Sequence, residues 1–79
     1  MDSARALIAA LGGAENILDI EPCSLRIRVE VASQHEVDEE GLRIPGVLAV
    51  VRSGAVVQIV AGQVSDSIAE EMREIVAAR

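Results

Sequence analysis

One cysteine and two arginines have the types and the spacing to do chemistry in this chain. Cys23 precedes Arg26 and Arg28 in the pattern C-x-x-R-x-R. Guanidinium groups close to a thiol favour its thiolate form, which is the nucleophile. The same two groups favour a dianionic phosphoryl group through charge-assisted, bidentate hydrogen bonds. The pattern therefore points to a cysteine that reacts as a nucleophile or carries phosphate.

A simpler interpretation of the same residues stays open. A lone cysteine in a small aliphatic protein is more often a buried and inert side chain. The arginines can be solvated strand residues, one of them pairing with Glu30 for almost no net stability. Against this, Glu21 and Pro22 make the segment before Cys23 a turn or a strand-end loop rather than core.

Length and composition allow one domain spanning residues 1–79 and exclude several classes of function. Half of the 79 residues are hydrophobic, yet none is aromatic. Aromatic stacking platforms for sugars or single-stranded nucleic acids are therefore absent. The formal charge is −6, whereas nucleic-acid binders usually carry a basic stripe. We expect a monomer that binds no nucleic acid.

The scarcity of ligating residues predicts no metal site and no cofactor. One cysteine cannot form an internal disulfide, and one histidine gives no recognisable ligand spacing. No run of residues approaches the ~20 apolar side chains of a membrane span. We therefore expect a cytoplasmic protein without a leader peptide.

Residues 24–32 form the clearest predicted strand, because apolar and polar side chains alternate along it. Its apolar members, which should all face the core, are Leu25, Ile27, Val29 and Val31. Its polar members, on the opposite face, are Ser24, Arg26, Arg28 and Glu30. The pattern places both arginines on one face of a sheet.

The rest of the chain predicts three helices and three more strands. Gly12 and Gly13 end the first helix, Asp38 caps a short second one, and Ser67 with Glu70 fits a capping box for the last. The expected helices are 3–11, a short one after 38, and one opening at 65–67; the other strands are 17–20, 47–51 and 56–60. The order α-β-β-α-β-β-α predicts an α+β open-faced sandwich, a four-stranded antiparallel sheet with helices on one face.

An ordered set of short motifs runs along nearly the whole chain. The motifs are L-G-G-x-E-N-I (11–17), C-x-x-R-x-R-V-x-V (23–31), V-D-x-x-G-L (37–42), V-V (50–51), V-Q (57–58), Gly62 and S-D-x-I (65–68). In order and spacing, this set resembles the IIB domain of the glucose–sucrose family of the bacterial sugar phosphotransferase system.

The resemblance implies a phosphocysteine carrier. A phosphohistidine of the IIA protein would phosphorylate Cys23, which would then phosphorylate a sugar held by the membrane-embedded IIC transporter. This is the activity of a protein-N(pi)-phosphohistidine–sugar phosphotransferase, at work on the inner face of the membrane. Arg26 and Arg28 fall on the two arginines associated with transfer, and glucose or N-acetylglucosamine is the expected sugar. The backbone N–H groups of Ser24 and Leu25 are the expected phosphate cradle.

Departures from the family pattern keep two alternatives open. Leu25 stands where the family usually has threonine, Pro22 where a small residue is usual, and Ala49 replaces a glycine. The first alternative is a non-catalytic IIB-like interaction or regulatory module with a weakened site. The second is an unrelated α/β ligand-binding domain in which Cys23 is buried and inert.

Overall fold

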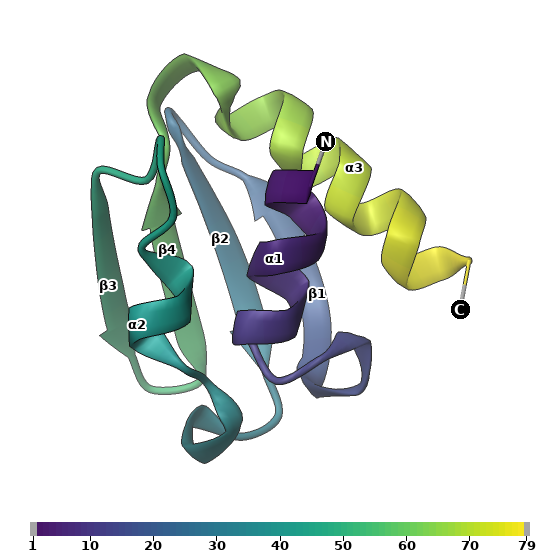
Figure 1. Cartoon of the computed structure of the whole chain (residues 1–79). Helices are drawn as coiled ribbons and strands as arrows, with labels where there is room; N and C mark the ends of the chain where they lie inside the picture. Colours follow the sequence, from purple (N-terminus) through teal and green to yellow (C-terminus); the bar gives the residue numbers. More distant parts are fainter. Residues whose placement is uncertain (1, 79) are drawn as a thin grey trace.

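The computed structural model describes residues 2–78 and contains the expected succession of helices and strands (Figure 1). The three α-helices are α1 (Asp2–Ala10), α2 (Glu39–Leu42) and α3 (Ser65–Ala77). The four strands are β1 (Ile17–Pro22), β2 (Arg26–Val31), β3 (Ala49–Ser53) and β4 (Val56–Val60). Short 3-10 helices precede β1, α2 and α3 at η1 (Ala14–Asn16), η2 (Gln34–Glu36) and η3 (Gly62–Val64).

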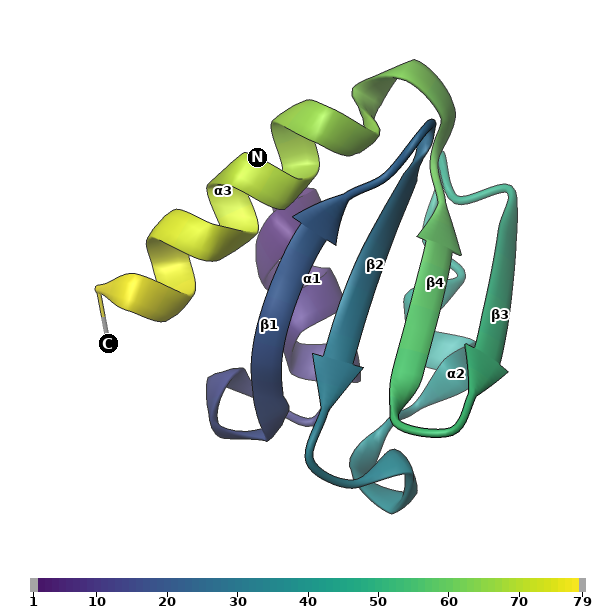
Figure 2. The same cartoon turned by 180° about the vertical axis from the view of Figure 1, so that it is seen from behind.

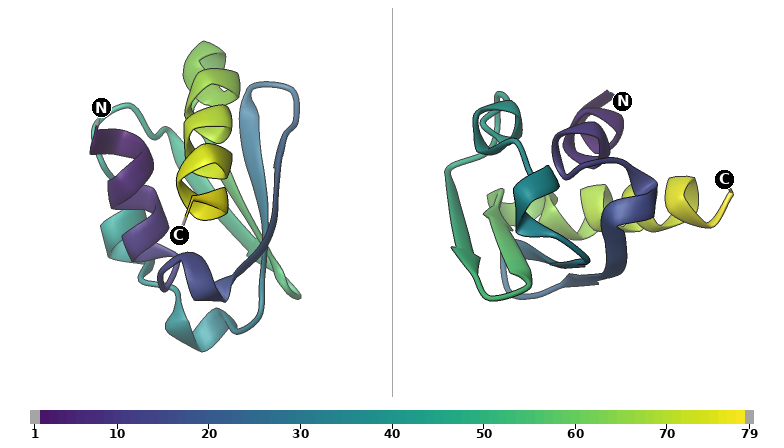
Figure 3. Two further views of the ribbon diagram at one scale, coloured as in Figure 1. Left: turned by 90° about the vertical axis from the view of Figure 1, so that its right-hand side faces the viewer. Right: turned by 90° about the horizontal axis from the view of Figure 1, so that it is seen from below.

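The strands form one antiparallel sheet in the order β1-β2-β4-β3, so β2 is an inner strand. All three helices lie on one side of this sheet (Figure 3). Seen from the other side, no helix covers the strands (Figure 2). The prediction of an open-faced α+β sandwich is confirmed.

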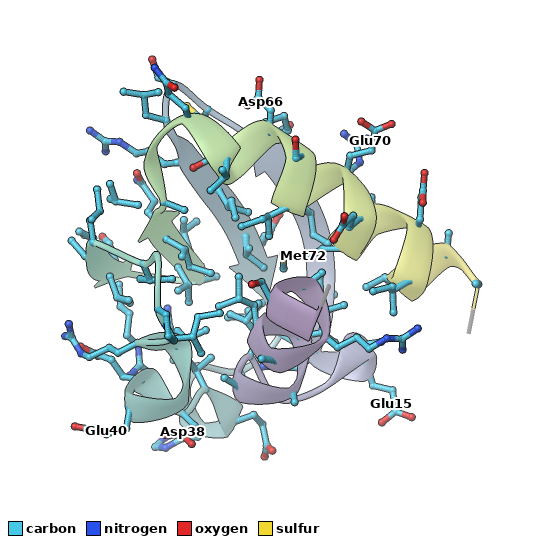
Figure 4. The ribbon with its side chains drawn as sticks, turned by 45° about the horizontal axis from the view of Figure 1, so that its top comes forward. Glu15, Asp38, Glu40, Asp66, Glu70 and Met72 are labelled. Carbon is cyan, nitrogen blue, oxygen red and sulfur yellow. The ribbon has the colours of Figure 1, made fainter. Side chains whose placement is uncertain are left out.

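The core fills the space between the sheet and the helices. Alternate residues of β2 and β4 point into it, and Ile27, Val29, Val57 and Ile59 are fully buried. From α3, Met72 points towards α1, whereas Asp66 and Glu70 point outward (Figure 4). The aliphatic core therefore fixes which face of the sheet remains exposed.

Gly12 and Gly13 end α1 in a Schellman motif. Gly13 donates its N–H to the carbonyl of Ile8 at 2.9 Å, and Gly12 donates to Ala9 at 3.1 Å. Both glycines have positive φ, and a Cβ on Gly12 would lie 2.8 Å from the Cβ of Glu36. The glycines of the first motif thus turn the chain from α1 towards β1.

Asn16, in the same motif, is a buried structural residue. Its Nδ2 donates to the carbonyls of Leu11 (2.7 Å) and Ser33 (2.9 Å), and its Oδ1 accepts from the Ser33 N–H at 2.9 Å. The side chain is 6% exposed. It joins the end of α1 to the loop after β2.

Replacing Asn16 with alanine is expected to lower the free energy of unfolding by about 2 kcal/mol, because three buried backbone groups would lose their partner. Urea denaturation followed by circular dichroism measures the change. The exposed neighbour Glu15 is the control, since Glu15→Ala should change stability by less than about 0.5 kcal/mol. Equal stabilities of the two variants would contradict this role.

Several predicted boundaries were wrong. Strand β1 continues to Pro22, although Glu21 and Pro22 were expected in a turn or a strand-end loop. Strand β2 begins at Arg26, so Ser24 and Leu25 lie outside it. Strand β3 runs from Ala49 to Ser53 rather than from 47 to 51, because residues 45–46 form a turn before it. Helix α3 follows η3 directly and has Val64 at its N-cap with no side-chain hydrogen bond. Ser67 therefore lies within the first turn of α3 and forms no capping box.

Helix α2 begins as expected but is capped differently. Asp38 is its N-cap residue, although its side chain makes no capping hydrogen bond. Val37 and Leu42, on either side of this start, are both buried. Apolar packing of the kind found in a hydrophobic staple accompanies this start.

A polar cluster ties α2 to β3 at the end of the sheet away from the β1–β2 turn (Figure 1). Arg43 donates to Glu39 at 2.8 Å, and Arg52 donates to Glu39 at 3.3 Å and to the Gln34 carbonyl at 2.7 Å. The hydrogen bond from Arg43, followed by that from Arg52, holds the pKa of the Glu39 carboxyl below its ordinary value. The cluster is partly exposed and joins α2, η2 and β3 through side-chain hydrogen bonds.

Candidate functional site

Cys23 lies in the tight turn that joins β1 to β2, and its side chain is exposed. Its N–H donates to the Arg26 carbonyl at 2.8 Å, and its carbonyl accepts from the Arg26 N–H at 3.2 Å. This exchange makes Cys23 and Arg26 the last paired residues of a two-residue hairpin. The cysteine is therefore a surface residue, and the interpretation that it is buried is wrong.

Ser24 and Leu25 form the two central positions of this turn. Both have positive φ, at 50° and 69°. Two consecutive left-handed residues are typical of a type I′ turn, whose twist matches that of the flanking strands. Neither residue is glycine, and each left-handed side-chain-bearing residue costs about 1–2 kcal/mol. The site is thus built on a strained backbone.

Contacts with the β4–η3 connection hold the turn in this conformation. The Leu25 carbonyl accepts the Gly62 N–H at 3.0 Å and the Ala61 N–H at 3.3 Å. The two segments lie side by side at the top of the sheet (Figure 2). The prediction that Leu25 faces the core was wrong, because the turn leaves its side chain 57% exposed.

Replacing Leu25 with glycine is expected to raise the free energy of unfolding by about 1 kcal/mol, because glycine adopts this φ without a steric penalty. Thermal or urea denaturation measures the change. The control is Leu18, another exposed leucine, which lies on β1 with negative φ. There glycine should lower stability by about 0.5–1 kcal/mol, so changes of the same sign in both variants would contradict the strain.

The strand register brings the predicted site residues together on the exposed face of the sheet. Pro22 pairs with Ile27 and Glu21 with Arg28, which places Cys23 opposite Arg26. Paired residues share a face, with Cβ atoms about 4.5–5.5 Å apart, and diagonal neighbours are about 7–8 Å apart. Cys23 is therefore the direct neighbour of Arg26 and the diagonal neighbour of Arg28.

The two guanidinium groups have different partners. Arg26 Nη1 donates to the Oε1 atom of Gln58 at 2.9 Å. Arg28 is half-exposed and lies opposite both Gln58 on β4 and Glu21 on β1, with its Nη1 4.0 Å from the Glu21 Oε1. A neutral amide thus orients Arg26, while a loose ion pair holds Arg28.

Gln58 and Glu21 are contacts of the site that the sequence pattern did not single out. Gln58 belongs to the V-Q motif, but it is separated from Arg26 by 32 positions along the chain. Only the pairing of β2 with β4 brings the two together. Glu21 could have been found, since an alternating strand on each side of a two-residue turn places it opposite Arg28.

The backbone N–H groups of Ser24 and Leu25 are available at the turn. Within residues 2–78, neither donates to another backbone carbonyl, whereas the Cys23 N–H is bonded to Arg26. Successive backbone N–H groups of a turn can form a concavity that binds an anion. The phosphate cradle at Ser24 and Leu25 stays a prediction.

The surroundings of the turn are open. A groove of about 370 Å³ runs beside it along α3 and is lined by Pro22, Asp66, Glu70, Arg73, Glu74 and Ala77. Cys23 and Leu25 are exposed at the tip of the hairpin, and the apolar side chain of Val51 is 48% exposed on the same face as the arginines. The Cys23 side chain is therefore accessible from solvent on the face that carries the two arginines.

No helix within residues 2–78 has the length and apolar character needed to cross a membrane. The described residues also contain no cluster of three or more histidine, cysteine or carboxylate side chains arranged to hold a metal ion.

Comparisons with known proteins agree with the resemblance found in the sequence. The family model "phosphotransferase system, EIIB" matches residues 5–38, which include Cys23 and both arginines. The N-acetylglucosamine-specific EIIB component of the phosphotransferase system of Streptomyces coelicolor is 39% identical over 72 residues, 91% of this chain and 94% of that protein.

A solved structure shares the fold. The crystal structure of one domain of the PTS system IIabc component from Clostridium difficile matches with a TM-score of 0.79 and 24% identity, over 92% of this chain and 77% of that one. The sequence identity with the Streptomyces protein, which extends over nearly all of both chains, shows that the two proteins belong to one family. This chain belongs to the glucose-type EIIB family of the sugar phosphotransferase system.

Proposed function

We propose that Cys23 is the phosphoryl carrier of this EIIB component, receiving the group from the phosphohistidine of a IIA protein and passing it to a sugar held by a IIC transporter. The observation that carries the proposal is the shared exposed face of Cys23, Arg26 and Arg28 at the end of the β1–β2 hairpin. In an EIIB protein, a thiol beside two arginines can accept a phosphoryl group while the guanidinium groups neutralise its charge.

In the first transfer, the Cys23 thiolate attacks phosphorus, the N–P bond of the phosphohistidine breaks, and the imidazole leaves. In the second, a sugar hydroxyl attacks phosphorus, the S–P bond breaks, and the thiolate leaves. The hydroxyl proton passes to a base of the partner or to water. Phosphoryl transfer requires mainly alignment and charge neutralisation. Arg26 and Arg28 supply the charge, and the N–H groups of Ser24 and Leu25 orient the phosphoryl oxygens.

N-acetylglucosamine is the proposed sugar, and the name of the Streptomyces relative, which is specific for it, supports this proposal. The chain would act at the inner face of the membrane through its contact with IIC.

The test is phosphorylation of the whole chain by phosphoenolpyruvate, the general phosphotransferase proteins and a matching IIA. We expect a mass increase of about 80 Da, that of one phosphoryl group, mapped to the peptide containing Cys23. Membranes containing the matching IIC should then release the label as sugar phosphate, with N-acetylglucosamine preferred to glucose. Absence of the mass increase, or its location on another residue, would refute the proposal.

The alternative is an interaction or regulatory module that binds its partners without phosphotransfer to a sugar. It is favoured by Leu25, which presents an exposed aliphatic side chain where the family usually has a hydroxyl. Ser24 presents a hydroxyl in the same turn, at the neighbouring position. Phosphorylated Cys23 that never yields sugar phosphate with any matched IIC would support the alternative.

A further inference from the structure

Glu21 is an acidic side chain placed inside the cationic site. It lies two residues before Cys23 on β1, so alternation puts both side chains on the exposed face. The register places it directly opposite Arg28, and its Oε1 lies 4.0 Å from Arg28 Nη1. With 57% of the Glu21 side chain and 41% of the Arg28 side chain exposed, either is free to change partner.

The two arginines therefore start from different electrostatic states. The partner of Arg26 is the neutral amide of Gln58, and no carboxylate within residues 2–78 forms an ion pair with it. The charge of Arg28 is partly offset by Glu21. A phosphoryl dianion on Cys23 would attract both arginines, but only Arg28 would have to leave a carboxylate.

We propose, on the basis of the function assigned above, that Glu21 is a positioning residue that competes with the phosphoryl group for Arg28. When Cys23 is unphosphorylated, Glu21 holds Arg28. When it is phosphorylated, Arg28 moves towards the new dianion, and Glu21 remains as an unpaired negative charge nearby. Glu21 thereby destabilises the phosphorylated form relative to the free form. Its effect is to keep the phosphoryl group transferable.

The consequence for transfer follows from the charges at each stage. As the S–P bond breaks, the phosphoryl group leaves for a sugar hydroxyl, or for water in hydrolysis, and the electron pair remains on sulfur. The departing charge releases Arg28, which pairs with Glu21 again. Removing the carboxylate would let Arg28 stay with the phosphoryl group and slow its departure.

The test compares Glu21→Gln with Glu30→Gln, using the whole chain. Glu30 is a matched control, because it is exposed on the same face of β2 and lies beyond Arg28, further from the turn. We expect Glu21→Gln to lengthen the half-life of phosphorylated Cys23 and to shift its equilibrium with phospho-IIA towards Cys23. Each change should be about two- to fivefold, as for half-exposed unit charges, and Glu30→Gln should change neither.

Two further variants separate positioning from a structural role. Glu21→Asp keeps the charge and should return the half-life most of the way to that of the wild type. In an Arg28→Ala background, Glu21→Gln should have a smaller effect, because the two residues act through each other. Equal half-lives for the Glu21→Gln and Glu30→Gln chains, or an undiminished effect without Arg28, would overturn the proposal.

Alkylation of the Cys23 thiol tests the same idea without phosphotransfer. Iodoacetate carries a negative charge and iodoacetamide does not. The rate with iodoacetate divided by the rate with iodoacetamide therefore reports the electrostatic potential at the sulfur. Glu21→Gln should raise this ratio about twofold relative to the wild type and to Glu30→Gln. If the wild-type chain accepts no phosphoryl group, the proposed function fails. The ratio of alkylation rates then decides whether the Glu21 carboxylate slows the approach of an anion to Cys23. An unchanged ratio would then refute this effect.

Discussion

Cys23→Ser should leave the chain fully folded and unable to accept a phosphoryl group, with no mass increase where the wild type gains about 80 Da. The side chain is exposed and lies outside the core, so the replacement removes no buried contact. A serine hydroxyl is a much weaker nucleophile than a thiolate at neutral pH. The loss should exceed a thousandfold in initial rate and is measured by mass spectrometry of the intact protein.

The matched control for this loss is Ser24→Cys in the Cys23→Ser background, which moves the thiol by one position within the turn. In urea denaturation, both variants should have the wild-type free energy of unfolding to within about 0.5 kcal/mol. Because the thiol at position 24 does not lie opposite Arg26, it should not restore phosphorylation of the chain. Phosphorylation of the Cys23→Ser chain at the wild-type rate would show that another residue carries the group.

Arg28→Ala should lower the rate of sugar phosphorylation about a hundredfold, the usual effect of removing one group that stabilises transition-state charge. Arg26→Ala should have an effect of similar size, because Arg26 is the direct neighbour of Cys23. Stability should change little, since both side chains lie on the exposed face. The measurement is the initial rate of sugar phosphate formation with saturating phospho-IIA.

Lysine at either position should recover only part of the lost rate, because an ammonium lacks the planar, bidentate geometry of a guanidinium. Arg5→Ala is the control, since Arg5 is an exposed cation of α1, on the other side of the sheet. It should change the rate by less than about twofold. A loss as large as that of Arg28→Ala would mean that net charge alone, rather than placement, explains the arginines.

The sequence was sufficient to predict the fold wherever the hydrophobic period was unbroken. Alternation along β2 predicted both the buried Ile27 and the exposed Arg26. It failed at Leu25, because an apolar residue at the correct period can still lie in a turn when the backbone reverses. The capping box predicted at Ser67 was also wrong, because η3 leads directly into α3 and no side chain caps the helix. Local patterns specify periodicity better than they specify ends.

The site was partly predictable for the same reason. Alternation placed Arg26 and Arg28 on one face, whereas Cys23 joins them there because the two-residue turn at Ser24 and Leu25 reverses the chain. The left-handed conformations of Ser24 and Leu25 were not predictable, because neither residue type favours positive φ. The contact of Arg26 with Gln58 depends on strand order, which periodicity does not determine.

That contact gives the site two parts that form at different times. The β1–β2 hairpin pairs residues that are close in sequence, between Ile17 and Val31. Gln58 arrives only when β4 pairs with β2, a closure over a long stretch of chain that carries a larger entropic cost. During synthesis, Cys23 and its arginines therefore precede the amide that orients Arg26. Until β4 pairs with β2, Arg26 lacks the amide that orients its guanidinium group.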